Sequence, residues 1–356
     1  LYRTDILLDQ LAYPHKMLEY LSTGNVVVCS RTLEMEAHTD LVVMAMERED
    51  ALGAFQKAVQ DFAALNTGPE RRSRISFAQE RSMDKLITRL SSLIMAAYNA
   101  EPYIEEAMAS ALGQSHAEIE LIVVNDGSTD GTAARIARCT DPRLQVIRQS
   151  NQGIGMARNA ALLVAKGSFI CFLDADDVMP PNSVSARLQV LLNDPALSFA
   201  DGTVIHYDVT LKHVLKVHTP SFHGEPLQLL ARFDPSCFFG NTWLIRWEAS
   251  RKERFERAIS HVEDMLFYLE IANGRRYGFT TEPVLRYRVT GASSMSRLEG
   301  LERSYHFVHR WMAARPQLFD RRTLRKNLYL VRRMMSGAYW HAGRPVQALL
   351  AWMRGR

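Results

Sequence analysis

The sequence predicts an α/β fold built on a parallel sheet with helices on both faces. Two observations support this prediction. Short apolar, β-branched runs alternate along the chain with stretches of helical spacing, and three of the apolar runs end in polar residues. Alternation of this kind is typical of parallel sheets. Ligands of such sheets bind beyond the carboxyl ends of the strands, so the polar strand ends indicate a binding site.

The size and composition are those of an ordinary globular protein. The 356 residues are 47% hydrophobic and 23% charged, which allows roughly two domains. The net charge of +4 gives no indication of nucleic acid binding. No apolar run approaches the roughly 18 to 20 residues needed to cross a bilayer, and Arg3, Asp5 and Asp9 argue against a signal peptide. The four cysteines lack CxxC spacing, which favours reduced thiols in a cytoplasmic protein.

The first ninety residues predict a partial α/β unit. We expect, in order, a helix, two buried strands and two helices over residues 14–24, 25–30, 41–46, 49–65 and 74–90. Pro14 stands near the start of the first helix and Gly24 follows its end, as is usual for these residue types. The sequence "NTGPERR" (66–72) is expected to separate the last two helices.

A second α/β pattern begins near residue 91. The expected strands cover residues 91–99, 119–126, 144–149 and 168–174, and the clearest helices between them cover 101–114 and 153–167. Three strand ends carry informative residues: Ala97-Tyr98, Asn125-Asp126, and Asp174 to Asp177. From residue 301 the chain is helical and basic. We therefore expect a partial unit over 1–90, a main domain over 91–300 and a basic helical region over 301–356.

The stretch "FICFLDADDVMP" (169–180) ends an apolar strand with Asp174, Asp176 and Asp177. Carboxylates this close together repel one another, and burying them is costly unless another charge offsets theirs. Mg²⁺ or Mn²⁺ would do so, because these ions bind one or two carboxylates together with waters and phosphates. The pattern thus indicates a metal that bridges the protein to a diphosphate. The alternative is that Asp174 and Asp177 cap turns and the following helix.

Four motifs occur in a specific order: "SLIMAAYNAEPYIEEAMASAL", "IELIVVNDGSTDGT", "NQGIGMARNAALLVAKGSFICFLDADD" and "HVEDMLFYLEIA". Together they resemble the family 2 glycosyltransferases of the GT-A fold, over about residues 91–295. The resemblance implies an enzyme that moves a sugar from a nucleotide-sugar donor, UDP-linked by the habit of the family, to an acceptor hydroxyl. A bacterial enzyme of this kind is expected to work in surface polysaccharide or glycan synthesis.

The resemblance also implies roles for particular residues. The nucleotide is expected to contact five of them: Ala97, Tyr98, Asp126, Arg158 and Asp174. Asp176 is expected to bind the divalent cation, and Asp264 of "VED" to act as the general base. One base and a neutralised diphosphate are what inverting transfer requires. The alternative for Glu263 and Asp264 is that both simply favour the first turn of a helix, where the helix dipole stabilises negative charge.

The two ends of the chain suggest further properties. Residues 1–90 resemble the C-terminal end of a GT-B glycosyltransferase, but they are less than one lobe of such an enzyme, so we expect no independent catalysis there. The arginine-rich region 301–356 predicts either helices that lie on an anionic membrane or helices that pack on the catalytic domain. We expect a nucleotide-sugar donor, a glycan or lipid-linked acceptor, and a cytoplasmic protein that is either free or peripheral at the inner face of the membrane.

Two departures from the family pattern keep other functions open. Thr290 stands where the family often has the His of a Tyr-Arg-x-His pattern, and Ala96 stands where Pro is frequent. The first departure is compatible with a non-catalytic protein that binds sugar nucleotides. A metal-dependent nucleotidyltransferase is a second alternative, but that class has a Gly-rich, basic loop where this chain has "AAYNAEPY".

Overall fold

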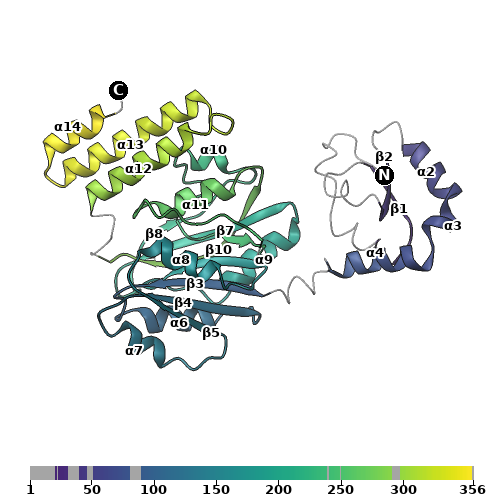
Figure 1. Cartoon of the computed structure of the whole chain (residues 1–356), viewed down its shortest axis with the longest axis horizontal. Helices are drawn as coiled ribbons and strands as arrows, with labels where there is room; N and C mark the ends of the chain where they lie inside the picture. Colours follow the sequence, from purple (N-terminus) through teal and green to yellow (C-terminus); the bar gives the residue numbers. More distant parts are fainter. Residues whose placement is uncertain are drawn as a thin grey trace. The chain divides into compact units, whose positions relative to one another are not determined.

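The computed structural model describes residues 21, 23–30, 40–45, 51–80, 90–238, 240–248, 250–290 and 297–354. The chain divides into two compact units: residues 1–88 with 192–196, and residues 89–191 with 197–356. Both are drawn in Figure 1. Apart from residues 21, 23 and 24, the helix expected over 14–24 lies outside the described residues.

In the first unit the two predicted strands are confirmed. β1 (Val27–Ser30) and β2 (Val42–Ala45) pair in parallel, and three helices follow: α2 (Ala51–Gln60), α3 (Phe62–Leu65) and α4 (Gly68–Glu80).

The start of α4 differs from the prediction, which placed it at Arg74. The Thr67 Oγ1 accepts a hydrogen bond from the backbone N–H of Glu70 (3.4 Å), and Pro69 occupies the first turn. Thr-x-x-Glu followed by a helix is a capping-box sequence, and proline suits the first turn because no intrahelical donor is needed there. The segment "NTGPERR" therefore begins a helix instead of separating two.

The second unit is built on one mixed sheet. In the described residues its strands lie in the order β10-β7-β9-β6-β3-β4-β5, and β8 pairs with β7. Their bounds are β3 Ser91–Ala97, β4 Ile119–Asp126, β5 Leu144–Gln149, β6 Phe169–Asp174, β7 Leu197–Tyr207, β8 Val214–His218, β9 Leu244–Arg246 and β10 Arg276–Arg288. The neighbours β6, β3, β4 and β5 are parallel, as predicted. The short β9 is antiparallel to both its neighbours and β8 is antiparallel to β7, so the sheet as a whole is mixed.

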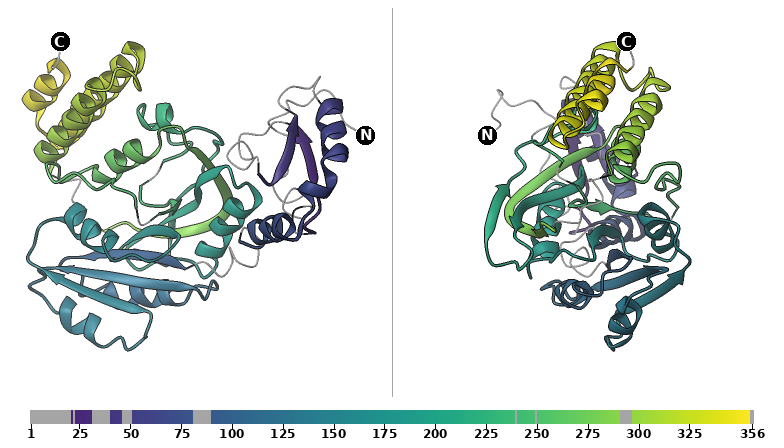
Figure 2. Two further views of the ribbon diagram at one scale, coloured as in Figure 1. Left: turned by 45° about the vertical axis from the view of Figure 1, so that its right-hand side comes forward. Right: turned by 90° about the vertical axis from the view of Figure 1, so that its left-hand side faces the viewer.

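Helices lie on both faces of this sheet, and a group of three helices follows at the C-terminal end (Figures 1 and 2). The helices of the first group are α6 Ile104–Leu112, α7 Thr132–Ala137, α8 Ile154–Leu162, α9 Ser183–Asn193, α10 Leu227–Leu230 and α11 Glu263–Ile271. The C-terminal group consists of α12 Leu298–Ala313, α13 Arg321–His341 and α14 Pro345–Met353. No helix in the described part of the chain is both long and apolar enough to cross a bilayer.

An aromatic cluster fills the core between the sheet and the helices. Trp243 is fully buried, and its ring stacks on that of Tyr268 with the centroids 4.3 Å apart. Trp247 is also buried and lies under the guanidinium of Arg251. These two tryptophans are therefore core residues.

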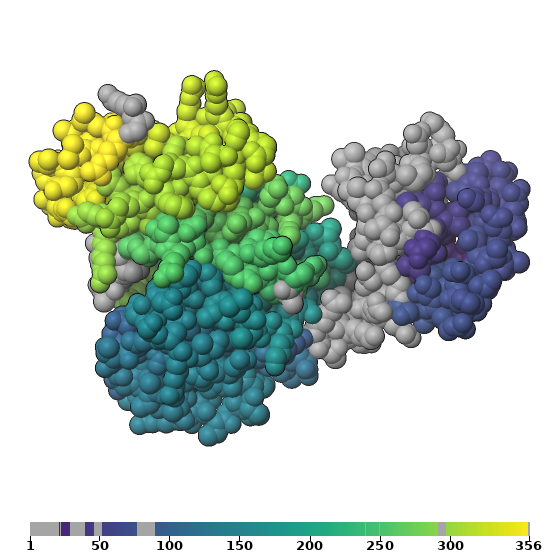
Figure 3. Space-filling view, viewed as in Figure 1, coloured from purple at the N-terminus to yellow at the C-terminus, as the bar shows by residue number. Residues whose placement is uncertain are grey.

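The C-terminal helices share this core. Val308 and Met312 of α12, and Phe319 after it, are buried in the same apolar cluster as Trp243. The Asn327 side-chain amide of α13 donates to the backbone carbonyl of Ala231 (2.8 Å). In the space-filling view the atoms of α12 and α13 rest directly on the preceding part of this unit (Figure 3). Of the two alternatives for the C-terminal region, packing on the preceding domain is thus observed for α12 and α13.

Candidate active site

Strand register brings the three predicted strand ends together. The central strand β3 pairs with β4 so that Ala97 lies opposite Asn125, and it pairs with β6 so that Ala96 lies opposite Asp174. Neighbouring parallel strands that end at the same level place their following loops side by side. The sequence motifs at residues 97–98, 125–126 and 174–177 therefore meet at one edge of the sheet.

The turn after β3 is held rigidly. Ala97 is buried, so it can offer a ligand only its backbone, whereas Tyr98 is half exposed and can offer its ring. Asn99 adopts a left-handed backbone conformation (φ 50°), which asparagine tolerates better than most residues. Its side-chain oxygen accepts a hydrogen bond from the N–H of Thr129 (2.8 Å), which ties this turn to the one after β4.

Asp126 anchors the loop that leads into α8. It is only 2% exposed, and it accepts hydrogen bonds from the Gln149 side chain (2.7 Å) and from the backbone N–H groups of Gln152 (2.9 Å) and Gly153 (2.8 Å). Gly153 has a φ of 90°, a conformation that favours glycine. Both carboxylate oxygens of Asp126 are thus used within the protein, and its contact with a nucleotide stays a prediction.

Arg158 links an acidic residue 16 positions later in the sequence to another 105 positions later. From α8, its Nη1 donates to Glu263 Oε1 (2.8 Å) and its Nη2 to Asp174 Oδ1 (2.8 Å). The guanidinium is 1% exposed and lies near the rings of Phe172 and Phe255. Burial opposes its positive charge, but the adjacent carboxylates outweigh that effect and raise the pKa of Arg158. Arg158 is therefore a cationic bridge between the acidic strand end and the start of α11.

Arg288 fixes the acidic turn after β6, a role that the sequence did not predict. Its backbone N–H donates to the Asp177 carboxylate (2.7 Å) and its Nε to the Asp176 carbonyl (2.7 Å). Its Nη2 also pairs with Glu106 (2.6 Å). Asp177 is buried and holds this turn, which agrees with the alternative in which it caps a turn. The signal for Arg288 was its place in "LRYRV", the segment that resembles the family's closing sequence.

The carboxylate of Asp176 is the one left available for a cation in this turn. It is half-buried, and no side chain among the described residues donates a hydrogen bond to it. Burial and the neighbouring Asp174 charge raise the pKa of Asp176 to about 6. The described residues contain no group of three or more His, Cys, Asp or Glu side chains that could hold a metal by itself. The donor set therefore fits an ion that takes most of its ligands from a diphosphate and water.

Asp264 lies in the first turn of α11, next to Glu263. Val262, just before the helix, has a left-handed backbone (φ 52°), which is strained for a β-branched residue and is typical of functional sites. Burial, followed by the charge of Glu263, raises the pKa of Asp264 to about 7, although the nearby Arg158 cation opposes this shift. A carboxylate with a pKa near the working pH is well suited to general base catalysis.

Thr290 follows β10 and is half-buried, and residues 291–296 lie outside the described residues. Residues 287–290, where the family often has the Tyr-Arg-x-His pattern, are thus described, but the stretch that follows them is not.

The family described as Glycosyl transferase family 2 matches residues 92–254. An uncharacterized glycosyltransferase of Haemophilus influenzae is 33% identical over 184 residues, which is 51% of this chain and 71% of that protein. The putative glycosyltransferase EpsH of Bacillus subtilis is 28% identical over 222 residues, 58% of this chain and 63% of that protein. The chondroitin synthase of Pasteurella multocida is 39% identical over 111 residues, 31% of this chain, and the match spans only 12% of that longer protein.

Two solved structures have the same fold as this chain. Residues 1–349 of S. aureus TarS, in complex with UDP-GlcNAc, align with a TM-score of 0.51 at 16% identity and cover 74% of this chain and 90% of TarS 1–349. The mannosyltransferase PcManGT of Pyrobaculum calidifontis, in complex with GDP-Man and Mn²⁺, aligns with a TM-score of 0.51 at 21% identity and covers 73% of each chain. The predicted GT-A fold is thus confirmed, while the GT-B-like nature of residues 1–90 stays a prediction.

Proposed function

The chain belongs to glycosyl transferase family 2, and from that premise we propose that it is an inverting, metal-dependent enzyme. It transfers a sugar from a nucleotide-sugar donor to an acceptor hydroxyl. The observation that carries this proposal is Asp264, a half-buried carboxylate whose pKa is raised to about 7 at the edge where three strand ends meet. We also propose that catalysis resides in the domain over residues 91–300, that the basic helical region over 301–356 supports it, and that the GT-B-like segment over 1–90 has no activity of its own.

The proposed reaction is a single displacement. Asp264 accepts the proton of the acceptor hydroxyl while the hydroxyl oxygen forms a bond to C1 of the donor sugar. The bond between C1 and the diphosphate oxygen breaks, and the nucleoside diphosphate leaves with the electron pair. One displacement at C1 inverts its configuration. The Arg158 bridge supports this step, because it holds Glu263 beside the base and Asp174 beside the expected donor.

Asp176 is the residue that we propose holds the divalent cation, Mn²⁺ or Mg²⁺, with Asp174 nearby. When bound, the ion supplies positive charge that stabilises the departing diphosphate. The raised pKa of Asp176 supports this assignment, because a buried carboxylate beside another acid gains most from a nearby cation. Ala97, Tyr98 and Asp126 remain the proposed neighbours of the nucleotide.

The relatives support a sugar-nucleotide donor and a glycan acceptor. TarS was solved with UDP-GlcNAc and PcManGT with GDP-Man and Mn²⁺, and two other relatives are named chondroitin synthase and hyaluronan synthase. We propose a UDP-linked donor and a role in bacterial surface polysaccharide synthesis.

A donor screen tests this function directly. Purified protein is incubated with UDP- and GDP-linked sugars and either Mn²⁺, Mg²⁺ or EDTA, and release of the nucleoside diphosphate is measured. We expect metal-dependent release with at least one donor and its loss in Asp176→Asn. The matched control is Asp141→Asn, which removes a half-buried acid that pairs with Arg143. Equal release in EDTA would contradict the metal assignment, and no release with any donor would favour the non-catalytic alternative.

The C-terminal helices also support a membrane contact. Along α14 the side chains at helical spacing of three and four residues are apolar and exposed, among them Val346 (66%) and Leu349 (60%). Trp340 on α13 is exposed as well. Trp is common at membrane interfaces, and the same helical pair carries exposed arginines that suit anionic lipids. We propose that this apolar face of α13 and α14 rests on an anionic bilayer.

Vesicle flotation tests the membrane contact. Val346→Glu combined with Leu349→Glu is expected to abolish flotation with phosphatidylglycerol vesicles, because two charges would enter the apolar face. The control pair is Leu215→Glu with Val217→Glu on β8, which changes equally exposed apolar residues elsewhere. Deleting the helices is not a usable test, since Val308 and Met312 belong to the core. Equal recovery of both double variants would contradict the proposal.

A further inference from the structure

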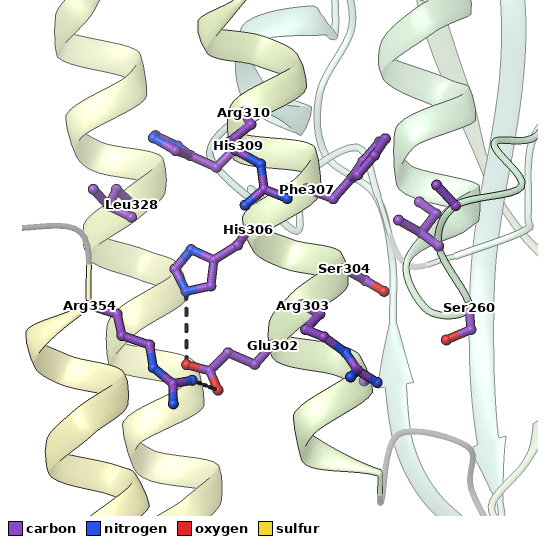
Figure 4. Close-up of a pocket in the computed structure, with 13 residues that line it drawn as sticks. Ser260, Glu302, Arg303, Ser304, His306, Phe307, His309, Arg310, Leu328 and Arg354 are labelled. Carbon is purple, nitrogen blue, oxygen red and sulfur yellow. Dashed lines mark hydrogen bonds and ion pairs between the residues drawn. The ribbon is translucent and has the colours of Figure 1, made fainter.

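A basic groove lies outside the site described above. It has a volume of about 790 Å³ and is bordered by the loop 258–260, by α12, by Leu328 of α13 and by Arg354 just after α14 (Figure 4). Its polar lining includes three arginines, Arg303, Arg310 and Arg354, together with His306 and His309. Glu302 is the acid that lines it.

The negative charge of Glu302 is already used inside the protein. Its side chain is 3% exposed, and its Oε2 accepts hydrogen bonds from Tyr339 (3.0 Å) and Arg354 (2.5 Å). The His306 Nε2 lies 3.8 Å from its other oxygen. Among the residues that the structure describes, Arg303 and Arg310 form no ion pair or side-chain hydrogen bond. The groove therefore has an excess of positive charge that its own carboxylate does not neutralise.

His309 is held in a defined orientation. The Asn327 amide nitrogen donates to the Ala231 carbonyl (2.8 Å), so the Asn327 oxygen must be the acceptor of the 3.0 Å contact with His309 Nδ1. The neutral imidazole thus carries its proton on Nδ1, and Nε2 is left for another partner. In the neutral ring Nε2 can only accept a hydrogen bond, whereas in the imidazolium form it donates and can bind an anion beside the arginines of the groove.

The groove adjoins the loop that leads into α11, the helix that carries the proposed base. Its wall, residues 258–260, is followed at once by His261, Val262 and then α11. At the start of α12 a Cβ added to Gly300 would lie 2.8 Å from His261 Cε1, so this helix packs closely on that loop. A molecule in the groove would therefore lie against the segment that positions Asp264.

We propose that this groove binds a phosphate group of an anionic acceptor. Guanidinium groups bind phosphate through paired, charge-assisted hydrogen bonds, and the imidazolium form of His309 adds a third donor through Nε2. The phosphate comes from one of two sources with the same chemistry: a phosphodiester of a soluble polymer, or the pyrophosphate head group of a lipid-linked glycan. The assignment to an acceptor depends on the proposed function, whereas the binding of phosphate does not.

The first experiment measures binding of inorganic pyrophosphate by calorimetry. EDTA is present so that the proposed metal site does not contribute. We expect Arg303→Ala combined with Arg310→Ala to weaken binding about tenfold or more, because two charge-assisted contacts are lost. Arg321→Ala combined with Arg322→Ala is the control, since it removes two exposed arginines of α13 that do not line the groove. Equal affinity in the two double variants would overturn the proposal, whether or not the protein transfers sugar.

The second experiment assigns the source of the phosphate. With a donor found in the screen, the Arg303/Arg310 double variant is expected to keep donor hydrolysis but to lose transfer to phosphate-bearing acceptors. Competition by a soluble glycerol phosphate polymer identifies a polymer source, and competition by a polyprenyl pyrophosphate in detergent identifies a lipid source. Unchanged acceptor KM in the double variant would overturn the acceptor assignment, while loss of hydrolysis in the wild type would instead count against the proposed function.

Discussion

Asp264→Asn is expected to reduce sugar transfer on the order of a hundredfold or more and to leave donor binding nearly unchanged. The amide has almost the same shape but cannot accept the proton of the acceptor hydroxyl. The measurement is kcat for transfer, together with the Kd for the nucleoside diphosphate in the same variant. Asp130→Asn is a suitable control, because Asp130 caps the turn before α7 through Thr132.

The pH dependence gives this prediction a second readout. The base works only when ionised, and the pKa of Asp264 is raised to about 7. In the wild type, kcat/KM is therefore expected to rise with pH up to about 7 and then to level off, and to fall about tenfold for each pH unit below that value. This acidic limb should be absent from Asp264→Asn. Unchanged turnover in the variant would rule out Asp264 as the base.

Arg158→Met is expected to lower the free energy of unfolding by about 3–5 kcal/mol, because it leaves the buried Glu263 carboxylate without its cation. Transfer should fall as well, since the cation that opposes the pKa shift of Asp264 is lost and the base becomes harder to ionise. Urea unfolding and the pH profile of the variant measure the two effects.

Two further variants make this result specific. Arg135→Met breaks the half-exposed pair with Glu105, and it is expected to cost less than about 1 kcal/mol. Adding Glu263→Gln to Arg158→Met removes the unpaired charge, so the double variant should regain part of the lost stability. If Arg158→Met and Arg135→Met were equally stable, the cationic bridge would have no energetic importance.

The sequence was sufficient to predict the strands that build the site. The runs that end at Ala97, Asp126 and Asp174 are largely apolar, as is expected of strands buried on both faces, and short polar turns mark where they end. Those strand ends meet in the structure because the strands are parallel and in register. β9 was not expected, since its three residues give no periodic signal.

The contacts between motifs could not be predicted in the same way. Arg158 was expected to lie near a nucleotide, and nothing in its local sequence indicates that it pairs with Glu263. Arg288 likewise acts on a turn 112 residues earlier through its backbone N–H and side chain. Such pairs depend on how β10 and α11 pack against the sheet, and a single sequence does not encode that packing in any local pattern.

The shared core of α12 and the sheet has an evolutionary consequence. Val308, Met312 and Phe319 pack in the same cluster as Trp243. The C-terminal helices therefore cannot be exchanged between relatives as an independently folding unit. A chimera joined near residue 300 would inherit mismatched apolar surfaces. Any lineage that acquires a new acceptor through these helices must therefore change the apolar residues of α12 and those of the domain beneath it together.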